Sequence, residues 1–329
     1  MKEDDIRPRE LLTEYLALSR KDVDIFFPEQ SREQVNCVGC GHPTSTLDFI
    51  KQGFCYRLCD SCGSLFVSPR PPEKNFQSFY EDSESSRYWA EIFFPAVAEL
   101  RREKIFRPRV SALKEMCQSR GVDVQTIVDV GAGYGIFLEE WKQDDPNVEA
   151  IAIEPSLDLA ETCKNKGLTV KPVTLENVNA SDIQADVAVC FEVLEHVHDP
   201  FIFLQKMSDL VRPGGLVMIS TLSIDGFDLQ VLGCKSDQIS PPHHINFLSC
   251  DGMKALFSRV DLQEVSVTTP GKLDVDIVRG AVKKTNSCVD LPPIIQAILS
   301  DPQSSSEFQD FLSRNRLSSH AWIVGSKKN

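Results

Sequence analysis

The chain has 329 residues, which suffices for one large domain and a smaller module. An apolar content of 42% and a charged content of 25% are typical of a soluble globular protein. The net charge of −13 disfavours extended binding to nucleic acid or to an anionic membrane, but it leaves room for one local basic pocket.

The N-terminal residues Met1–Asp5 are mostly charged, and no apolar core of a secretory signal follows them. No apolar run approaches the length of a membrane span. Eleven cysteines in such a chain predict thiols and a metal site in a reducing compartment rather than a disulfide framework. We therefore expect a cytoplasmic protein.

Residues 1–36 are predicted to form an N-terminal helical extension. Apolar side chains recur there at roughly helical spacing, with charges between them. The members of this stripe are Leu11, Leu12, Tyr15, Leu16 and Leu18. The pattern favours a helix that docks on the rest of the chain, and a partner-binding helix is the alternative.

Residues 37–72 contain two C-x2-C pairs with eighteen residues between them, a spacing typical of structural zinc sites. The ligands would be Cys37, Cys40, Cys59 and Cys62. Four thiolates close a tetrahedron and leave no open position for catalysis, so we expect zinc to stabilise a small ribbon. Cys55 and His42 are spare ligand candidates. A redox pair is less favoured, because two pairs compete for that role.

Residues 73–125 are predicted to be a helix-rich lead-in or lid. Phe76, Phe79 and Tyr80 open it, and a polar stretch follows them. Farther along, Pro95 and Pro108 are expected to interrupt the helices, because proline lacks the backbone donor.

Residues 126–329 alternate strand and helix patterns, which predicts an α/β fold with a doubly wound parallel sheet. Strands are expected at 126–130, 149–154, 168–174, 186–191, 216–220, 262–268 and 320–326. A helix is expected at 157–166, a turn at 212–215, and two short helices at 294–299 and 308–312. Asp274 is expected to be exposed near the start of another helix.

The first strand leads from Asp129 into a turn with Gly131, Gly133 and Gly135, and a helix follows. Glycine is needed there because a side chain would keep a ligand from the backbone and the helix N-terminus. The second strand ends in Glu154, whose carboxylate can accept both hydroxyls of a ribose. An acid beside the glycines suits an ammonium group better than a phosphate. The ligand is therefore predicted to be a nucleoside without a pyrophosphate.

Asp129–Gly135 and Ile151–Pro155 resemble the first two motifs of the class I S-adenosylmethionine (SAM) methyltransferases. The resemblance implies a Rossmann-like sheet of seven strands with an antiparallel last hairpin, and SAM as the methyl donor. The donor-binding residues implied in these two motifs are Asp129, Gly131, Ala132, Gly133, Glu154 and Pro155.

The fourth strand ends in Phe191 and runs into Glu192-Val-Leu-Glu-His-Val-His. Carboxyl ends of parallel strands face the ligand crevice, so Phe191, Glu192, Glu195 and His196 should lie near the donor, the last three on a shared helical turn. In one interpretation Glu192 contacts the donor and His196 faces the acceptor. In the other, Glu192, Glu195 and His196 bind Mg, as in metal-dependent O-methyltransferases of the ubiquinone pathway or of small-RNA 2′-hydroxyls.

Two prolines precede His243 and His244 in the loop after the fifth strand. Histidine has an unperturbed pKa suited to removing a proton near neutral pH. By resemblance to the P-x-x-H segment of sugar C-methyltransferases, His244 is the leading general-base candidate and His196 the second. The alternative is that one histidine of the pair bonds to the loop and the other is exposed.

The ribbon, the exit Ser68-Pro-Arg-Pro71 and the Phe-Tyr segment resemble bacterial methyltransferases of sugar and cell-surface polysaccharide pathways. This resemblance implies a small hydroxylated acceptor, foremost a nucleotide-linked sugar, and an aromatic side chain at the active site, Tyr80 or Tyr88. Two alternatives remain open. One is metal-dependent O-methylation of a quinol-like or RNA 2′-hydroxyl acceptor, and the other is a SAM-binding regulatory or scaffold protein without turnover.

Overall fold

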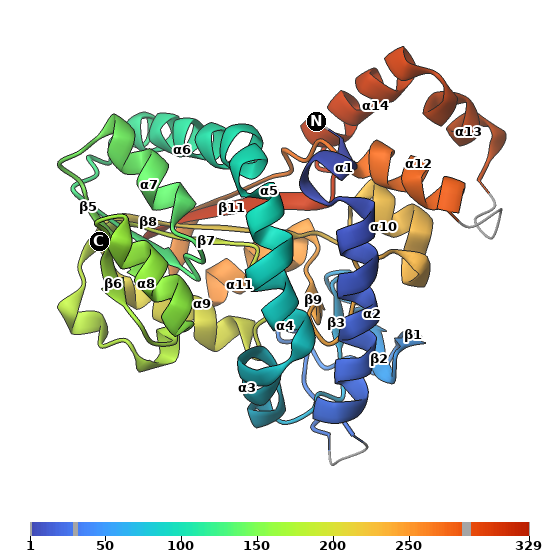
Figure 1. Cartoon of the computed structure of the whole chain (residues 1–329), viewed down its shortest axis with the longest axis horizontal. Helices are drawn as coiled ribbons and strands as arrows, with labels where there is room; N and C mark the ends of the chain where they lie inside the picture. Colours follow the sequence, from blue (N-terminus) through green and yellow to red (C-terminus); the bar gives the residue numbers. More distant parts are fainter. Residues whose placement is uncertain (1, 29–31, 285–290, 329) are drawn as a thin grey trace. The chain divides into compact units, whose positions relative to one another are not determined.

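A seven-stranded sheet has the strand order β10-β11-β8-β7-β4-β5-β6 in the computed structural model (Figure 1). Its strands are β4 (Thr126–Val130), β5 (Glu149–Ile153), β6 (Thr169–Lys171), β7 (Ala185–Phe191), β8 (Val211–Leu222), β10 (Leu262–Thr268) and β11 (His320–Lys327). β4 pairs in parallel with both β5 and β7. The chain winds outward from β4 to β6 and then returns to the other side of β4, so the sheet is doubly wound as predicted.

The structure describes residues 2–28, 32–284 and 291–328. These residues divide into two compact units, each assembled from segments distant in sequence. The sheet unit comprises residues 96–220, 254–266 and 323–329, and the ribbon unit comprises residues 1–95, 221–253 and 267–322. Cys288, one of the eleven cysteines, lies outside the described residues. No helix in the described part of the chain is long and apolar enough to cross a membrane.

The central strands of the sheet are buried over almost their whole length. β4 is buried from Ile127 to Val130, and β7 is buried from Ala185 to Cys190. Continuous burial is typical of parallel strands that are covered on both faces, and it explains why these segments are nearly uninterrupted apolar runs. The carboxyl ends of β4, β5 and β7 therefore lie side by side at one edge of a rigid sheet.

The predicted turn at 212–215 is part of β8 instead. The pairing with β7 shifts register there, from Ala185 opposite Val211 to Val187 opposite Leu216. The extra residues form a bulge, in which Gly214 has a φ of +76°. A Cβ on Gly215 would lie 2.9 Å from the Asp186 carbonyl oxygen, so the bulge also needs a glycine at that position.

The helices that follow the sheet strands are short and well defined. They are α7 (Ile136–Asp144), α8 (Leu157–Asn165), α9 (Pro200–Leu210) and α11 (Cys250–Arg259), with 3-10 turns η3 (Leu175–Asn177) and η4 (Ala180–Asp182). α8 contacts β5 and β6, and α9 contacts β7. α9 begins where it does because the Asp199 carboxylate caps the amides of Phe201 and Ile202, and Pro200 suits the first helical position.

Residues 84–119 of the lead-in form one continuous helical run, so the predicted interruptions at Pro95 and Pro108 are wrong. Its segments are α4 (Glu84–Tyr88), η1 (Trp89–Phe93), α5 (Phe94–Arg101), η2 (Arg102–Phe106) and α6 (Arg107–Ser119). η1 and η2 are π-helical turns, closed by bonds from the amide of residue 94 to the carbonyl of 89 and from 107 to 102. Each proline follows one of these wider turns directly, which relieves the clash that proline causes in a regular helix.

The ribbon unit contains a four-stranded antiparallel sheet in the order β1-β2-β3-β9. Its strands are β1 (Leu47–Lys51), β2 (Phe54–Leu58), β3 (Leu65–Val67) and β9 (Asn246–Phe247). The fourth strand comes from the loop after β8, far from the other three in sequence. Helices α1 (Glu3–Ile6), α2 (Arg9–Phe26) and α3 (Glu73–Asp82) belong to the same unit, and α2 contacts both α3 and α4. The predicted N-terminal helix is thus confirmed.

The remaining helices of the ribbon unit are α10 (Phe227–Leu232), α12 (Asp274–Lys284), α13 (Pro293–Ser300) and α14 (Pro302–Arg314), with a 3-10 turn η5 (Gly233–Lys235). α12 contacts α10 and α14. Asp274 is buried, not exposed as predicted, because its carboxylate accepts hydrogen bonds from the Ser319 amide at 2.6 Å and from Gln309 Nε2 at 2.8 Å.

Candidate functional site

The glycine turn after β4 has three residues with left-handed backbone conformations. The φ angles are +74° at Gly131, +54° at Gly133 and +66° at Gly135. A Cβ would lie 2.8 Å from Val193 Cγ2 at Gly131 and 2.8 Å from Leu168 Cδ1 at Gly135, whereas nothing lies within 4 Å at Gly133. Gly131 and Gly135 are therefore required by packing as well as conformation. At Gly133 only the backbone conformation requires glycine, and the space beside its Cα is open.

Asp129 lies at the end of β4, beside this turn, and is only 3% exposed. Its Oδ1 atom is buried and has no hydrogen-bond partner among the described residues. Burial raises the pKa of Asp129 to about 8, while the positive charge of Arg109 lowers it and the charge of Glu154 raises it. A buried carboxylate oxygen without a donor is costly, and a cationic donor from a ligand would satisfy it.

Glu154 ends β5 and holds the turn from the other side. One carboxylate oxygen accepts a hydrogen bond from the Gly133 amide at 2.8 Å, and the other accepts from the Ser156 amide at 3.0 Å. Burial raises the pKa of Glu154, while these two bonds lower it. A carboxylate has about four acceptor positions, so Glu154 keeps capacity for ligand hydroxyls. Ala132 is half-buried and Pro155 exposed at the same edge of the sheet.

The segment after β7 does not form the predicted helical turn that places Glu192, Glu195 and His196 together. Glu192 has a φ of +56°, which is outside the helical region, and only a tight turn follows, with the His196 amide donating to the Val193 carbonyl at 2.9 Å. The predicted magnesium triad is also not formed, since Glu192 does not gather with the other two among the described residues. The Glu192 carboxylate accepts hydrogen bonds from Arg109 and Ser220 instead.

Arg109 lies beside these predicted site residues, and the sequence did not predict it. Its Nη2 atom donates to Glu192 Oε1 at 2.9 Å, and its guanidinium lies 4.8 Å from the Phe191 ring centroid. Burial lowers the pKa of Arg109, and the neighbouring charge of Glu192 raises it. Ser220 Oγ completes the arrangement by donating to the same Glu192 oxygen at 2.5 Å. Arg109 lies in α6, where a single arginine in a helix gives no signal of its role.

The two loop histidines of the ribbon unit have different surroundings. His244 Nδ1 lies 2.6 Å from the Gln238 carbonyl oxygen, to which it must donate. This bond fixes the tautomer with the lone pair on Nε2. His243 is buried instead, with its ring 4.7 Å from that of Phe79 and 5.0 Å from that of Tyr15. Thus neither histidine is simply exposed, and they differ in that His244 bonds to the loop backbone through Nδ1.

Tyr80 belongs to the same part of the ribbon unit. Its hydroxyl donates to the His243 carbonyl at 3.4 Å, and 39% of the residue remains exposed. Tyr88 is half-buried in α4, and burial raises its pKa. Of the two predicted aromatics, Tyr80 is the one that contacts the histidine loop in the hydrogen bonds described.

The four predicted zinc ligands come together in a cluster within the ribbon unit. The cysteine sulfurs all lie within 4.8 Å of one another, with 3.5 Å between Cys37 and Cys62 and 3.6 Å between Cys40 and Cys59. A tetrahedral ion with Zn–S bonds of about 2.3 Å would separate its sulfurs by about 3.8 Å. The cluster therefore fits zinc. The spare candidates Cys55 and His42 are not part of it.

Both cysteine pairs lie on the same kind of turn. The Gly41 amide donates to the Cys37 carbonyl, and the Gly63 amide donates to the Cys59 carbonyl, each at 2.8 Å. Both glycines have left-handed φ angles, +78° and +75°. A hydrogen bond from the Cys37 thiol lowers the pKa of Cys62, which favours the thiolate that a metal requires.

A doubly wound seven-stranded sheet with an acid and a glycine turn at the end of its first strand defines the SAM-dependent methyltransferase class. Residues 80–267, more than half of the chain, match the family described as Methyltransferase domain. The chain belongs to this family, and its sheet unit carries a class I methyltransferase fold. The plantazolicin methyltransferase BpumL, solved in complex with S-adenosylhomocysteine (SAH), has the same fold, with a TM-score of 0.51, 13% identity, and coverage of 77% of this chain and 94% of that one.

Two relatives are similar in sequence. The ubiquinone biosynthesis O-methyltransferase of Colwellia psychrerythraea is 36% identical over 120 residues, which cover 33% of this chain and 47% of that protein. The protein of the same name from Vibrio parahaemolyticus is 31% identical over 161 residues, covering 45% and 68%. The chain spans about half the length of the Colwellia and Methylococcus relatives.

Proposed function

We propose that this protein transfers the methyl group of SAM to a hydroxyl oxygen of a small acceptor. The observation that carries the proposal is the buried Asp129 Oδ1, which lies beside the glycine turn without a donor among the described residues. The ammonium group of the methionine part of SAM would satisfy that oxygen. The names of the relatives, ubiquinone biosynthesis O-methyltransferases, support oxygen as the acceptor atom.

The residues at the carboxyl ends of β4, β5 and β7 would hold the donor. Asp129 would bind the ammonium group, and Arg109, whose charge acts on Asp129, would bind the carboxylate of the same amino acid. Glu154 would accept the ribose hydroxyls, while Gly131, Ala132 and Gly133 expose the turn and Pro155 borders it. Glu192 would orient Arg109 through the bond at 2.9 Å, and Phe191 would contribute an apolar wall.

For this reaction the protein must orient the donor and the acceptor and remove the proton of the acceptor hydroxyl. When bound, SAM supplies a methyl group that is already activated on a sulfonium. The acceptor oxygen forms the new bond to carbon as the carbon–sulfur bond breaks, and its proton must leave. His244 is our candidate to take that proton on Nε2, because the bond from Nδ1 to the Gln238 carbonyl holds the ring in that tautomer. His196 is the second candidate, and Tyr80 would line the acceptor side.

We further propose that Cys37, Cys40, Cys59 and Cys62 bind one structural zinc ion. The sulfur separations support this assignment, and four cysteine ligands leave no position for a substrate. The ion would hold the two glycine-containing turns against each other beside the small sheet.

Calorimetric titration with SAM and SAH tests the donor site. Asp129→Asn and Arg109→Lys should each weaken binding roughly 10- to 100-fold, because a hydrogen bond to a charged group contributes about 1.5–3 kcal/mol. Asp123→Asn, an exposed acid just before β4, is the matched control and should bind as the wild type does. Absence of SAM binding in folded wild-type protein would contradict the proposal and favour a protein without methyl transfer.

The acceptor is tested by turnover with a panel of small molecules, with the methylated atom identified by NMR. Catechols and hydroquinones are the first arm, and we expect methylation at oxygen. Nucleotide-linked sugars form the second arm, because the ribbon and the Ser68-Pro-Arg-Pro71 exit predict them while the names of the relatives do not support them. A product methylated on carbon would overturn the proposed acceptor atom.

A further inference from the structure

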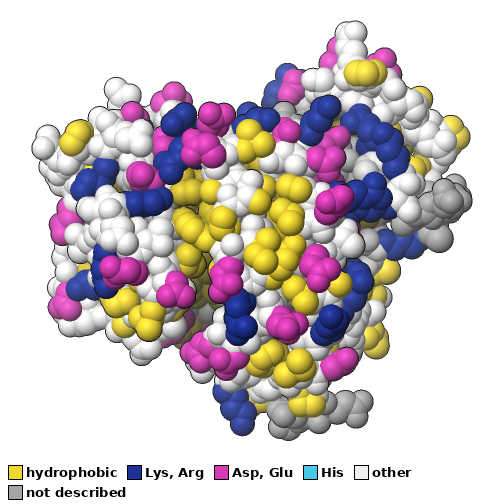
Figure 2. Space-filling model, viewed as in Figure 1, with side chains coloured by type: hydrophobic (Ala, Val, Ile, Leu, Met, Phe, Trp, Pro, Cys, Tyr) yellow, Lys and Arg dark blue, Asp and Glu magenta, His cyan; other side chains and the backbone are white. Residues whose placement is uncertain are grey.

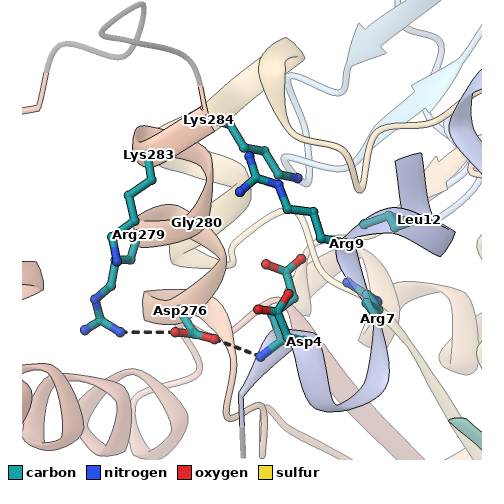
Figure 3. Close-up of a pocket in the computed structure, with 10 residues that line it drawn as sticks. Asp4, Arg7, Arg9, Leu12, Asp276, Arg279, Gly280, Lys283 and Lys284 are labelled. Carbon is teal, nitrogen blue, oxygen red and sulfur yellow. Dashed lines mark hydrogen bonds and ion pairs between the residues drawn. The ribbon is translucent and has the colours of Figure 1, made fainter. Parts of the chain in front are cut away.

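A charged cavity of about 160 Å³ lies within the ribbon unit, where α1, the start of α2 and the second half of α12 meet (Figure 3). Five basic and three acidic side chains line it among the described residues. The basic ones are Arg7, Arg9, Arg279, Lys283 and Lys284. In the space-filling view, basic and acidic side chains gather over these same helices (Figure 2). None of these residues belongs to the cysteine cluster or to the donor edge, which we define as the proposed SAM-binding residues at the carboxyl ends of β4, β5 and β7.

The acids of the cavity balance its cations only in part. Asp276 is engaged on both oxygens, accepting from Arg279 Nη1 at 3.1 Å and from the Glu3 amide at 2.7 Å (Figure 3). Burial raises the pKa of Glu3, the charges of Arg7 and Lys284 lower it, and those of Asp276 and Asp237 raise it. The charge of Glu3 is thus disfavoured by its own position.

The cations come from two separate places in the sequence, residues 7–9 and 279–284. Arg7 donates to the neutral Gln238 side chain at 2.8 Å, whereas Lys284 pairs with Asp237 at 3.0 Å. Arg9 and Lys283 are exposed at the same cavity. Asp276 and Asp237 each pair with one of the five cations, which leaves Arg7, Arg9 and Lys283 against Glu3 and Asp4. The cavity therefore keeps a small excess of positive charge, which favours an anion.

We propose that this cavity binds a phosphate group, either free or carried by a small organic molecule. Arginine guanidiniums form paired hydrogen bonds with phosphate, and the first turn of α2 adds the positive end of its helix dipole at Arg9. The volume is below the roughly 300–1,000 Å³ of a drug-sized pocket, so the cavity would enclose the phosphate or diphosphate group of a ligand rather than the whole of a larger molecule. The site is separate from the proposed methyl transfer.

Gly280 in α12 keeps the cavity open. A Cβ at that position would lie 3.3 Å from Glu3 Oε2, so a larger side chain would project into the space that the anion needs. Gly280→Leu therefore fills the cavity while keeping every charge. This variant therefore distinguishes an anion bound inside the cavity from an anion attracted by surface charge.

Thermal denaturation of the full chain tests the proposal. The probes are inorganic phosphate, diphosphate and a nucleoside diphosphate, each against sodium chloride of equal ionic strength. Binding to the native state alone raises Tm with concentration. We expect Tm to rise for the wild type and for Lys21→Gln, an exposed charge farther along α2. The rise should disappear in the Arg9→Gln, Lys283→Gln double variant and in Gly280→Leu.

Two results would overturn the proposal: equal Tm values in phosphate and chloride, or a rise that Gly280→Leu retains. If Gly280→Leu fails to fold, the exposed double variant still decides the outcome. A response to inorganic phosphate and diphosphate assigns a free anion, whereas a response confined to the nucleoside diphosphate assigns an organic phosphate. SAM titration of the double variant should be unchanged, so failure here is distinct from failure of the methyltransferase proposal.

Discussion

The cysteine cluster and the donor edge of the sheet differ in how fully their own polar groups are satisfied. In the cluster, each pair of sulfurs lies on a turn closed by its own backbone bonds, and the four ligand atoms face one another. At the donor edge, a buried carboxylate oxygen of Asp129 has no donor among the described residues. The ligand atoms of the cysteine cluster are arranged to enclose a metal ion, whereas the donor edge presents an oxygen that a bound ligand would satisfy.

This difference predicts that losing a cysteine harms stability, whereas losing a donor-edge residue harms binding or rate. The strongest effect is expected for Cys59→Ser. Structural zinc sites contribute on the order of 10 kcal/mol to folding, so the variant should lose its metal and much of its ribbon unit. Metal analysis and thermal denaturation measure both. Cys55→Ser, a β2 cysteine outside the cluster, should keep about one zinc per chain, and equal metal loss in both variants would contradict the assignment.

A smaller effect, confined to rate, is expected for His244→Asn. Removing a general base typically lowers turnover by about 10²–10⁴-fold. SAM affinity and zinc content should stay at wild-type levels, since His244 belongs to neither site. His243→Gln provides the comparison, because its ring packs between Phe79 and Tyr15 and its loss should lower Tm. Unchanged kcat in a folded His244→Asn variant would shift the role of base to His196.

The smallest effect is a proton released on SAM binding. In the free protein burial raises the pKa of Asp129 to about 8, so the carboxyl is mostly protonated at pH 7. An ammonium partner would favour the carboxylate and expel that proton. Titrations at pH 7 in buffers of different ionisation enthalpy should detect release approaching one proton, with less at pH 9. Asp129→Asn should abolish the release, and identical release in that variant would identify another group.

The raised pKa of Asp129 also makes the stability of the folded protein depend on pH. Its pKa is higher in the folded than in the unfolded chain, so the native state binds the proton more tightly. Stability therefore falls as pH rises from the unfolded pKa towards about 8. Asp129→Asn removes this loss, so the variant should gain Tm relative to the wild type at pH 8 and show little gain at pH 4. A difference in Tm between variant and wild type that stays constant from pH 4 to pH 8 would contradict the raised pKa of Asp129.

The parts of the molecule that the sequence predicts well are those whose signal is local. The cysteine spacing predicts the cluster because each pair lies on one turn. The apolar runs predict all seven strands because parallel strands are buried on both faces. Asp129, the three glycines and Glu154 come together as predicted, since neighbouring parallel strands end at the same edge.

The features that the sequence does not predict depend on partners far away in the chain. Arg109 lies beside Phe191 and Glu192, more than 80 residues later in the chain, and Glu192 has a backbone conformation outside the helical region just after β7. The bulge in β8 is determined by its pairing with β7. The helix continues through Pro95 and Pro108 because a π-helical turn precedes each one, which no proline rule anticipates.

The origin of β9 limits how this protein can be divided. Phe247 of β9 pairs with Leu65 of β3, and the Tyr56 hydroxyl donates to the His244 carbonyl at 2.7 Å. The strands of the ribbon and the histidine loop are therefore one structural unit, although about 180 residues separate them in the sequence. Removal of residues 1–72 would take β3 away from β9 and expose Phe247. Chimeras that exchange the ribbon must carry the histidine loop with it.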